Sequence, residues 1–377
     1  MTSEPPTEPS KDTTALDDHA EDSHAEGTHS PSTGDDARDR LYASTADLYD
    51  RVAARLSSRL IGSYSTSFTL STRLLGPRVR QDIHNLYGIV RVADEVVDGA
   101  AGGHGLPLER IREVLNDYEQ RVREGCATGF STDPIIHAFI GTAQSCDIKN
   151  SHLAAFFESM RADIPSSVPP SAPAPSSAHQ APQSTTVYDA ETRDTYIYGS
   201  AEVIGLMCLS IFLRDETPPP ADRRTMEEGA RHLGAAFQKI NFLRDYAADK
   251  DGLNRDYVAH GKPLDDETKD AFLAEIYRDL SIAHQEIPLL PVSSRLGVRA
   301  AYALFLKLAH SLEHTPAQKV TSSRIRVGNA TKLLVTAQSV VAGETRRFRT
   351  RRRRGGNSCG CPWSSQRNLR RQGQRRQ

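Results

Sequence analysis

Four aspartates in this sequence stand at a spacing that suits the binding of a metal ion. The segment FQKINFLRDYAAD spans residues 237–249 and places Asp245 and Asp249 four residues apart, with Asn241 and Gln238 before them. An α-helix advances 3.6 residues per turn, so Asn241, Asp245 and Asp249 share one face. The other positions are largely apolar, so the polar stripe is predicted to point into the protein. Buried carboxylates need a compensating cation, either Arg, Lys or a metal ion.

The same arrangement occurs upstream, in NLYGIVRVADEVVDG at residues 85–99. Tyr87, Arg91, Asp94 and Asp98 recur there at helical spacing, and apolar residues surround them. One acidic helix face is more often solvated or ion-paired than metal-binding. Two such faces, each with an Arg on or near it, favour a shared metal site.

Carboxylates without His or Cys are hard oxygen ligands, which select Mg²⁺ or Mn²⁺. Because Mg²⁺ keeps several waters and shares phosphate oxygens, we expect a phosphorylated substrate between the two helices. Arg91 and Arg244 can add bidentate contacts to phosphate. GAAGGHG at 99–105 follows a helical segment and lacks the G-x-G-x-x-G spacing, so a Rossmann or Walker site is not expected.

The elements that position these residues belong to an all-α body. From Leu41 to Gly343 the apolar residues recur at helical spacing, with few alternating runs and no Asn-Gly hairpins. The Pro/Ala/Ser-rich stretch 166–185 interrupts this pattern and is interpreted as a surface insertion within one domain. We therefore expect a catalytic helical domain at 41–345.

Both ends of the 377-residue chain differ from this body. Residues 1–40 are acidic and rich in Ser, Thr and Pro, which is typical of a disordered arm. Residues 346–377 form an Arg-rich tail that is predicted to be disordered, so the net charge of −1 is a cancellation between unlike ends. The tail is interpreted as a solvated segment, with binding to nucleic acid or an anionic membrane and out-of-frame translation as alternatives.

No signal peptide and no run of about 18 uninterrupted apolar residues is found, so we expect a cytoplasmic protein. We also expect a monomer. Cys126, Cys146 and Cys208 lie in helical patterns and are interpreted as reduced core residues. Cys359 and Cys361 have no second pair or nearby His, so a zinc site is not expected.

Two long segments, 63–99 and 234–257, resemble the squalene and phytoene synthases, which are head-to-head prenyltransferases. The likeness runs from about Tyr42 to Gln338, leaving out the insertion. It implies an isoprenoid-synthase-type helical bundle with a central apolar cavity and two aspartate-rich helices across its mouth. It also implies that these helices hold Mg²⁺ on the substrate diphosphates.

The resemblance assigns roles by position in the motifs. The residues matched to catalysis are Asp94, Asp98, Asp245, Asp249, Tyr87 and Arg91. Those matched to substrate binding are Phe68, Tyr196, Tyr198, Gln238, Asn241, Arg244, Arg255 and Tyr257. Those matched to metal binding are Asp94, Glu95, Asp98, Asn241, Asp245 and Asp249.

The sequence departs from the family pattern at four positions. Glu95 replaces a more common Asp, Glu202 and Asn254 stand where Gly is usual, and Phe305 occupies a position that is often Tyr. We expect these residues to affect the cavity wall more than the metal site, and therefore product identity before activity.

The resemblance implies condensation of two prenyl diphosphates through a cyclopropylcarbinyl diphosphate. Faces of Phe68, Tyr87, Tyr196 and Phe237 can stabilise carbocations there, although core packing is the simpler interpretation of each aromatic. Our first choice is phytoene from two geranylgeranyl diphosphates in carotenoid biosynthesis, without NADPH. The alternative is a C30 synthase that makes squalene or dehydrosqualene from farnesyl diphosphate. Peripheral membrane contact, with the Arg-rich tail as one candidate for it, is expected from the apolar product.

Two rival interpretations remain. A head-to-tail prenyl synthase or terpene cyclase also uses acidic motifs, but the pairing of R-x-x-D-E-x-x-D with N-x-x-R-D-x-x-x-D disfavours both. The non-enzyme alternative is a helical interaction protein that acts through the Arg-rich tail, although no nucleic-acid partner is expected. Replacing Asp94 or Asp245 by Ala would separate enzyme from interaction protein.

Overall fold

The computed structural model describes residues 33–165, 186–252, 255–322 and 325. The chain groups into two compact units, Met1–Asp47 and Leu48–Gln377. In the first unit the described residues 33–47 are helical. The second unit holds every predicted site residue.

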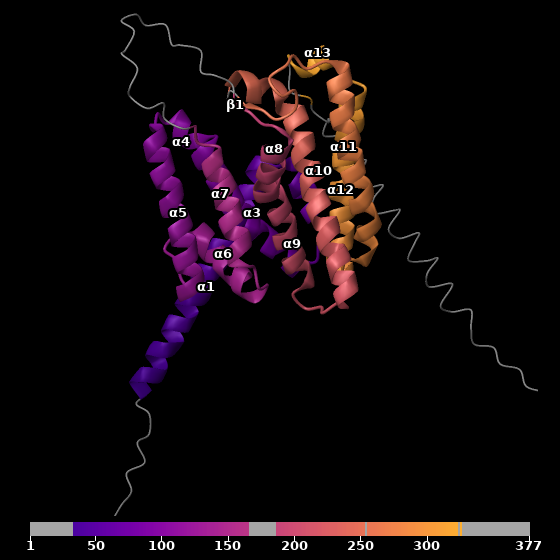
Figure 1. Ribbon diagram of the computed structural model, residues 1–377. Helices are drawn as coiled ribbons and strands as arrows, with labels where there is room; N and C mark the ends of the chain where they lie inside the picture. Colours follow the sequence, from indigo (N-terminus) through magenta and orange to yellow (C-terminus); the bar gives the residue numbers. More distant parts are fainter. Residues whose placement is uncertain (1–32, 166–185, 253–254, 323–324, 326–377) are drawn as a thin grey trace, which may run out of the picture. The chain divides into compact units, whose positions relative to one another are not determined.

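The described part of the chain is almost entirely helical, which confirms the all-α prediction (Figure 1). The helices of its first half are α1 (Thr33–Tyr64), α2 (Thr66–Thr72), α3 (Pro77–Val97), α4 (Ala100–Gly103), α5 (Leu108–Thr128), α6 (Pro134–Ser145) and α7 (Asn150–Ala162). The second half contains α8 (Ala190–Ile197), the π-helix η1 (Tyr198–Glu202), α9 (Val203–Leu213), α10 (Pro220–Gly252), α11 (Asp266–Glu286), the 3₁₀ helix η2 (Ile287–Leu289), α12 (Val292–Glu313) and α13 (Ala317–Val320). Two short strands, β1 (Thr186–Val187) and β2 (Arg255–Asp256), pair in parallel with Thr186 opposite Arg255.

The helical chain begins earlier than the sequence pattern predicted. Helix α1 starts at Thr33, ahead of the expected boundary at residue 41. The remaining arm, the insertion 166–185 and the Arg-rich tail lie outside the described residues, as does Asn254.

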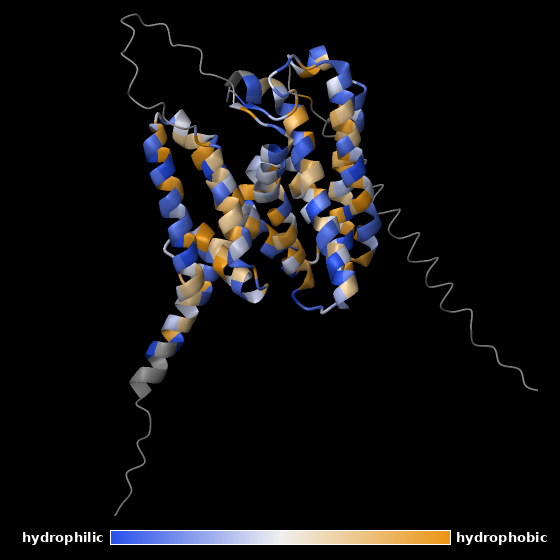
Figure 2. Cartoon of the chain, in the orientation of Figure 1, coloured by the Kyte–Doolittle hydropathy of each residue, from blue (hydrophilic) through white to orange (hydrophobic). Residues whose placement is uncertain are grey.

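Apolar helix faces form two main clusters, as helical periodicity predicts. Leu86, Leu115 and Phe139 belong to a cluster built by α3, α5, α6, α7 and one side of α9. Ile240 and Ile276 belong to a second cluster, built largely by α10, α11 and α12. Figure 2 shows the corresponding mixture of hydrophobic and hydrophilic residues along each helix. Helices α9 and α10 pack against each other between these clusters.

The run Ala190–Leu213, which joins α8, η1 and α9, differs from the expectation that no segment could span a membrane. By length and composition alone this run is long and apolar enough to cross a membrane, with a mean hydropathy of 1.6 over 18 residues. In the structure 44% of that window is buried, and Met207 and Ile211 belong to the core. We therefore interpret the run as a core helix.

Glycines let α10 approach η1 and α9 closely. A Cβ atom on Gly205 would lie 2.3 Å from the carbonyl oxygen of Ala230, and one on Gly234 would lie 2.5 Å from that of Ala201. Neither helix can accept a side chain at these points without moving, because the neighbouring atoms are backbone. The two glycines therefore fix the spacing of helices that also wall the cavity described below.

This close approach predicts that Gly234→Ala destabilises the fold. The added methyl group must push α10 away from η1, and overpacking of this kind costs about 1–3 kcal/mol. Gly62→Ala is the matched control, because Gly62 is also helical and nothing lies within 4 Å of its Cβ position. The control should be neutral or stabilising by up to about 1 kcal/mol. Urea unfolding followed by circular dichroism compares the two, and equal stability would contradict the packing.

Candidate active site

The two acidic helices converge through the side chain of Arg255. Its Nη2 donates to Asp98 Oδ1 at 2.8 Å and its Nη1 to Asp98 Oδ2 at 3.2 Å. Asp98 follows the last residue of α3, whereas Asp249 lies near the end of α10. Both Asp98 and Arg255 influence the pKa of Asp249, so the end of the first motif lies near the end of the second.

Arginines pair with the carboxylates of both motifs. Arg91 binds Asp94 at 2.6 Å and also pairs with Glu95. Arg244 Nε donates to Asp245 Oδ1 at 3.0 Å. Among the described residues, no group of three or more His, Cys, Asp or Glu side chains is arranged to hold a metal ion. The carboxylates are therefore compensated by guanidinium groups in this arrangement.

The donor set nevertheless fits Mg²⁺ or Mn²⁺ chemically. Burial raises the pKa of Asp94 to about 6, with repulsion from Asp98 and Glu95 adding to the shift and Arg91 opposing it. Burial and then repulsion from Asp245 raise the pKa of Asp249 to about 7. A bound cation would offset the cost of burying these carboxylate charges and would reduce the repulsion between them. Asn241 Oδ1 is also buried without a hydrogen-bond partner, so it is a further hard oxygen donor.

Asp163 is a site residue that sequence reasoning missed. It is 2% exposed at the end of α7, and its Oδ1 lies 3.3 Å from Nη1 of Arg255. Tyr196 donates its hydroxyl to Asp163 Oδ2 at 2.8 Å. Burial raises the pKa of Asp163, and the charge of Arg255 opposes that shift. Asp163 has no partner at helical spacing in the sequence, so its only signal was an Asp directly after an apolar helix.

The turn after β2 fixes the position of Arg255. Asp256 is fully buried, and its Oδ1 accepts hydrogen bonds from the backbone N–H groups of Val258 and Ala259 at 3.0 and 2.7 Å. Its Oδ2 accepts from Gly261 at 2.8 Å. An Asp that folds the chain around its own carboxylate gives a rigid turn. Arg255, one residue earlier, is thereby held against Asp98.

The tyrosines predicted to bind substrate lie in different environments. Tyr196 and Tyr257 stack at 5.3 Å, and Tyr257 also stacks on Phe242 at 4.0 Å. These rings support Asp163 and Arg255 and are not part of the cavity wall. Tyr198 is 39% exposed and lies under the guanidinium of Arg231. The structure therefore does not bring Tyr198 to the acidic site.

An apolar cavity of about 300 Å³ lies among α2, α3, η1, α9, α10, α11, η2 and α12. Gln238 and Asn241 line it at the end nearer the α10 aspartates, and Ser200 contributes a buried hydroxyl without a hydrogen-bond partner. Met226, Glu286 and Leu290 also line it, toward the start of α10 and the end of α11. The cavity thus combines a polar end near the carboxylates with an otherwise apolar wall.

Aromatic rings gather at the polar end of the cavity. Phe68 and Phe237 line it, with ring centroids 6.4 Å apart. Tyr87 meets Phe68 edge-on at 6.4 Å, and burial raises the pKa of Tyr87 to about 12. Tyr87 is therefore a neutral hydroxyl beside the acidic helix at ordinary pH.

Two departures from the family pattern do not lie where we expected. Glu202 forms an ion pair with Arg231 at 2.6 Å and does not line the cavity. Phe305 stacks behind Phe237 at 3.7 Å and likewise is not a lining residue. The π-helix η1 explains the first case, because it turns Ser200 and Ala201 toward the cavity and Glu202 away from it.

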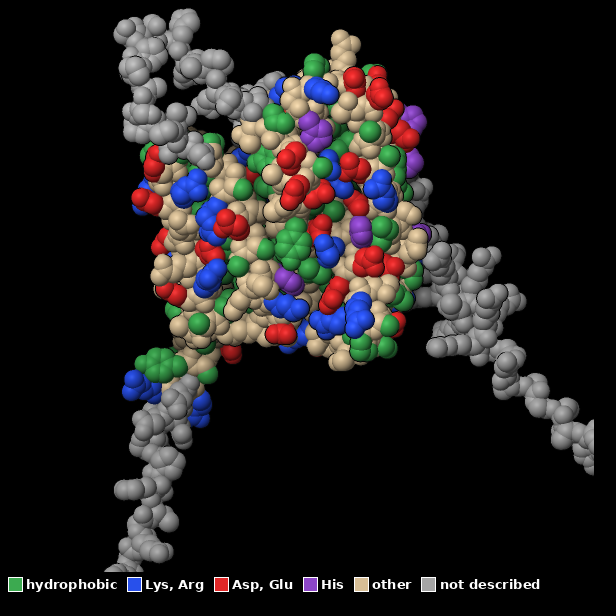
Figure 3. Space-filling model, in the orientation of Figure 1, with side chains coloured by type: hydrophobic (Ala, Val, Ile, Leu, Met, Phe, Trp, Pro, Cys, Tyr) green, Lys and Arg blue, Asp and Glu red, His purple; other side chains and the backbone are tan. Residues whose placement is uncertain are grey.

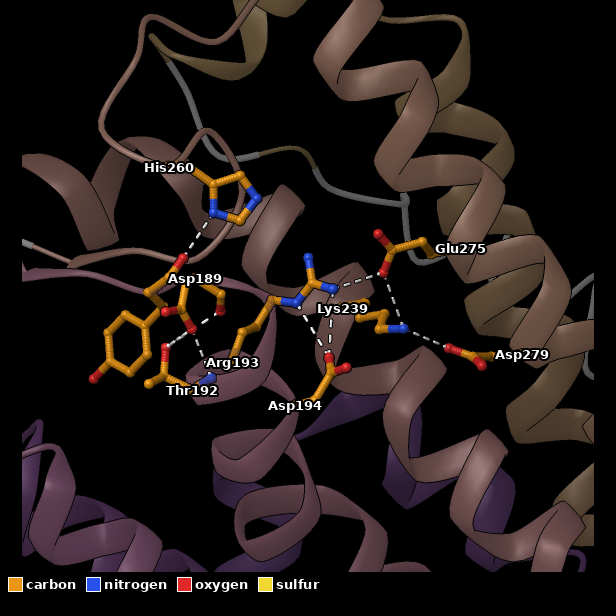
Figure 4. A network of polar contacts seen from close by, with 9 residues as sticks. Asp189, Thr192, Arg193, Asp194, Lys239, His260, Glu275 and Asp279 are labelled. Atoms are coloured by element: carbon orange, nitrogen blue, oxygen red, sulfur yellow. Dashed lines mark hydrogen bonds and ion pairs between the residues drawn. The ribbon is translucent and has the colours of Figure 1, made fainter.

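A buried ion network holds α8 against α10 and α11 (Figure 4). The buried Arg193 donates to Glu275 at 2.9 Å, and Lys239 bridges Glu275 and Asp279 at 3.2 and 2.9 Å. Asp189 caps the start of α8 by accepting from the N–H of Thr192. The helix that carries Tyr196 is thus pinned to the helix that carries the second acidic motif.

Comparison with known proteins agrees with this geometry. The sequence model of the family described as squalene/phytoene synthase matches residues 61–260. A bifunctional lycopene cyclase/phytoene synthase from Phycomyces blakesleeanus is 27% identical over 285 residues, which cover 67% of this chain but only 44% of that protein. The chloroplastic phytoene synthase of Daucus carota is 23% identical over 323 residues, covering 80% of this chain and 72% of that one. A solved dehydrosqualene synthase aligns with a TM-score of 0.60 at 16% identity, covering 78% and 98% of the two chains, and so shares the fold.

The raised pKa of Asp249 predicts how stability depends on pH when EDTA removes divalent cations. Its pKa is about 7 when folded against an ordinary value of 3.8, so the folded state binds the proton more tightly. The free energy of unfolding should therefore fall as pH rises from about 4 to 7, by up to about 1.4 kcal/mol per pH unit for one proton. Asp249→Asn should flatten this dependence, whereas the exposed Asp117→Asn should not. Urea titrations across this range measure both, and identical slopes would contradict the burial of Asp249.

Proposed function

The chain belongs to the squalene/phytoene synthase family, and on that premise we propose that it condenses two geranylgeranyl diphosphates head to head to phytoene in a Mg²⁺-dependent reaction. The observation that carries this proposal is the apolar cavity whose polar end adjoins two facing aspartate motifs. A prenyl diphosphate has the same division into a charged head and an apolar chain.

The extent of the cavity supports a long substrate. Its lining residues on α10 run from Asn241 to Met226, which corresponds to about 22 Å along the helix axis. Ordinary carbon–carbon bond lengths make the sixteen-carbon main chain of a C20 prenyl group about 19 Å long when extended. Two curated relatives are named as phytoene synthases, which also favours the C20 substrate.

In this proposal the acidic motifs hold the diphosphates through metal ions. Asp94, Glu95, Asp98, Asn241, Asp245 and Asp249 would hold Mg²⁺. When bound, the metal neutralises the diphosphate and makes it a better leaving group. Arg91 and Arg244 pair with carboxylates in this arrangement, and each can turn its guanidinium to phosphate oxygens instead. The buried Arg255 stays on Asp98 and Asp163 and positions the first motif.

The reaction needs a dry cavity once the first diphosphate leaves. The allylic carbon of one chain then bonds to the double bond of the second, and loss of a proton gives a cyclopropylcarbinyl diphosphate. The second diphosphate leaves, and the cation rearranges and loses a further proton to give the hydrocarbon. The apolar lining excludes water, and the faces of Phe68 and Phe237 can stabilise positive charge without forming a bond.

The alternative product is a C30 hydrocarbon made from farnesyl diphosphate. It is favoured by the likeness in fold to a dehydrosqualene synthase. The two candidates share the acidic motifs and differ in how far the chain must reach past Gln238. The interaction-protein interpretation is disfavoured by the membership of the chain in an enzyme family.

A product assay tests the proposal. Purified protein receives Mg²⁺ and either farnesyl or geranylgeranyl diphosphate, with and without NADPH, and the extracted hydrocarbon is identified by mass. We expect a C40 product from geranylgeranyl diphosphate without reductant. A C30 product would select the alternative, and the NADPH requirement would then distinguish squalene from dehydrosqualene.

Asp94→Ala and Asp245→Ala should each lower turnover by at least about 100-fold, because each removes a charged group that acts on the leaving diphosphate. Asp117→Ala is the matched control, since Asp117 is exposed on α5 and far in sequence from both motifs. Turnover that survives in both site variants, with normal circular dichroism, would rule out the assigned carboxylates.

Cys208 provides a test of chain length, because it lines the cavity on α9. Cys208→Phe fills part of the cavity and should lower kcat/KM for geranylgeranyl relative to farnesyl diphosphate by about tenfold, the usual scale for a small change of pocket volume. Cys126→Phe is the control, since Cys126 is partly buried outside the cavity. An unchanged ratio would show that the chain does not pass Cys208.

A further inference from the structure

Helix α1 carries an unusual share of the exposed apolar side chains. Six of the twelve large hydrophobic residues that are exposed in the described chain lie on it. Within the second unit these include Leu48, Val52 and Leu56, which are 54%, 40% and 42% exposed. Because they follow one another at four-residue intervals, they share one face of the helix.

Three arginines are interleaved with this apolar row. Arg51, Arg55 and Arg59 are exposed, and Arg55 and Arg59 fall on the same face as Val52. Within the part of the chain that the structure describes, no ion pair is found for any of the three. The neighbouring Asp50 lies on the opposite side of the helix, where its Oδ1 is 2.7 Å from Nε2 of His137. Apart from Asp47, which stands four residues before Arg51 at its edge, the outer face therefore combines aliphatic and cationic side chains.

Several exposed arginines on other helices are accompanied by acids. Arg110 pairs with Glu113, Arg121 with Asp117 and Arg223 with Glu227. The space-filling view in Figure 3 likewise shows basic and acidic side chains interspersed over the visible face. The α1 face differs from this background in both its charge and its apolar content.

The inner side of α1 is fixed to α3. Gln81 donates to the carbonyl oxygen of Ala54 at 2.9 Å, and Ser58 hydrogen-bonds with Gln81 and His84 at 3.2 and 3.0 Å. The helix is thus anchored on the element that carries Asp94. Its outer face can contact a partner without releasing these bonds.

We propose that the outer face of α1, formed by Leu48, Arg51, Val52, Arg55, Leu56 and Arg59, docks onto the surface of an anionic lipid bilayer. A helix that mixes aliphatic residues with unpaired arginines lies in the plane of such an interface, where the aliphatic groups enter the acyl boundary and the arginines bind lipid phosphates. This inference uses surface residues alone and does not depend on the proposed reaction.

Charge argues against a second copy of the chain as the occupant. Two α1 faces packed together would bring six arginines into one contact with only the two copies of Asp47 to offset them, which like-charge repulsion disfavours. A protein partner would need acidic groups opposite the three arginines and apolar groups opposite the aliphatic row within the same contact. A bilayer with anionic headgroups satisfies both kinds of side chain at once.

Insertion is tested with a single-tryptophan reporter in the full chain. Trp363 is the only tryptophan in the sequence, so Trp363→Phe supplies a silent background and Val52→Trp places a probe on the face. With phosphatidylglycerol/phosphatidylcholine vesicles we expect a blue shift of emission and quenching by brominated lipids. Val292→Trp is the matched control, because Val292 is 60% exposed on α12, and its emission should not change.

Three outcomes would overturn the proposal. Vesicle binding with unchanged emission from Val52→Trp would assign binding to another segment, such as the Arg-rich tail. A blue shift that grows with protein concentration without lipid would assign the face to self-association. Emission that is already blue-shifted in dilute protein without lipid would mean that the acidic residues 1–32, or another part of the chain, cover it.

Charge reversal provides an independent test. Arg51→Glu/Arg55→Glu/Arg59→Glu should lower partitioning onto anionic vesicles by at least about tenfold. The control Arg110→Glu/Arg121→Glu/Arg223→Glu makes the same change in net charge on other helices and should have a much smaller effect. All six side chains are solvent-accessible, so circular dichroism should be unchanged. Equal losses in the two variants would show that only net charge matters and would refute docking through α1.

Discussion

The guanidinium of Arg255 holds together carboxylates that would otherwise repel one another. It binds Asp98 at the end of the first acidic helix and Asp163 at the end of α7, and its charge also acts on Asp249 of the second. These groups are partly or fully removed from water, where an uncompensated charge is costly. The parallel pairing of β1 with β2, the turn around Asp256 and the tyrosine stack all serve to fix this one cation.

The second constraint is the spacing between α10 and the η1–α9 segment. Gly205 and Gly234 let backbones meet at distances that exclude a side chain, so the cavity wall has little freedom to move. The π-helix in the same wall divides its residues between two environments. Ser200 faces the cavity, and Glu202 pairs with Arg231 outside it. Product length should therefore depend on the residues that line the cavity below Gln238, among them Cys208, and not on Glu202.

Helix α3 connects the first acidic motif with the inner side of α1. The same helix presents Asp94 to the mouth and Gln81 and His84 to the inner side of α1. If α1 docks on a bilayer, the first half of α3 lies directly behind the docked helix. A hydrocarbon product is insoluble in water, so attachment to a bilayer would suit the proposed reaction.

The sequence by itself determined the helical class and the two acidic faces, because helical periodicity of 3.6 residues is a local property that spacing reveals. It also predicted Arg91 and Arg244 beside the carboxylates. Only the tertiary structure decided that Asp163 joins Arg255, that Tyr196 supports this pair while Tyr198 lies outside, and that Glu202 and Phe305 are not lining residues. These outcomes depend on contacts between segments far apart in the chain and on a π-helix that shifts the register of one face, and neither is encoded in local spacing.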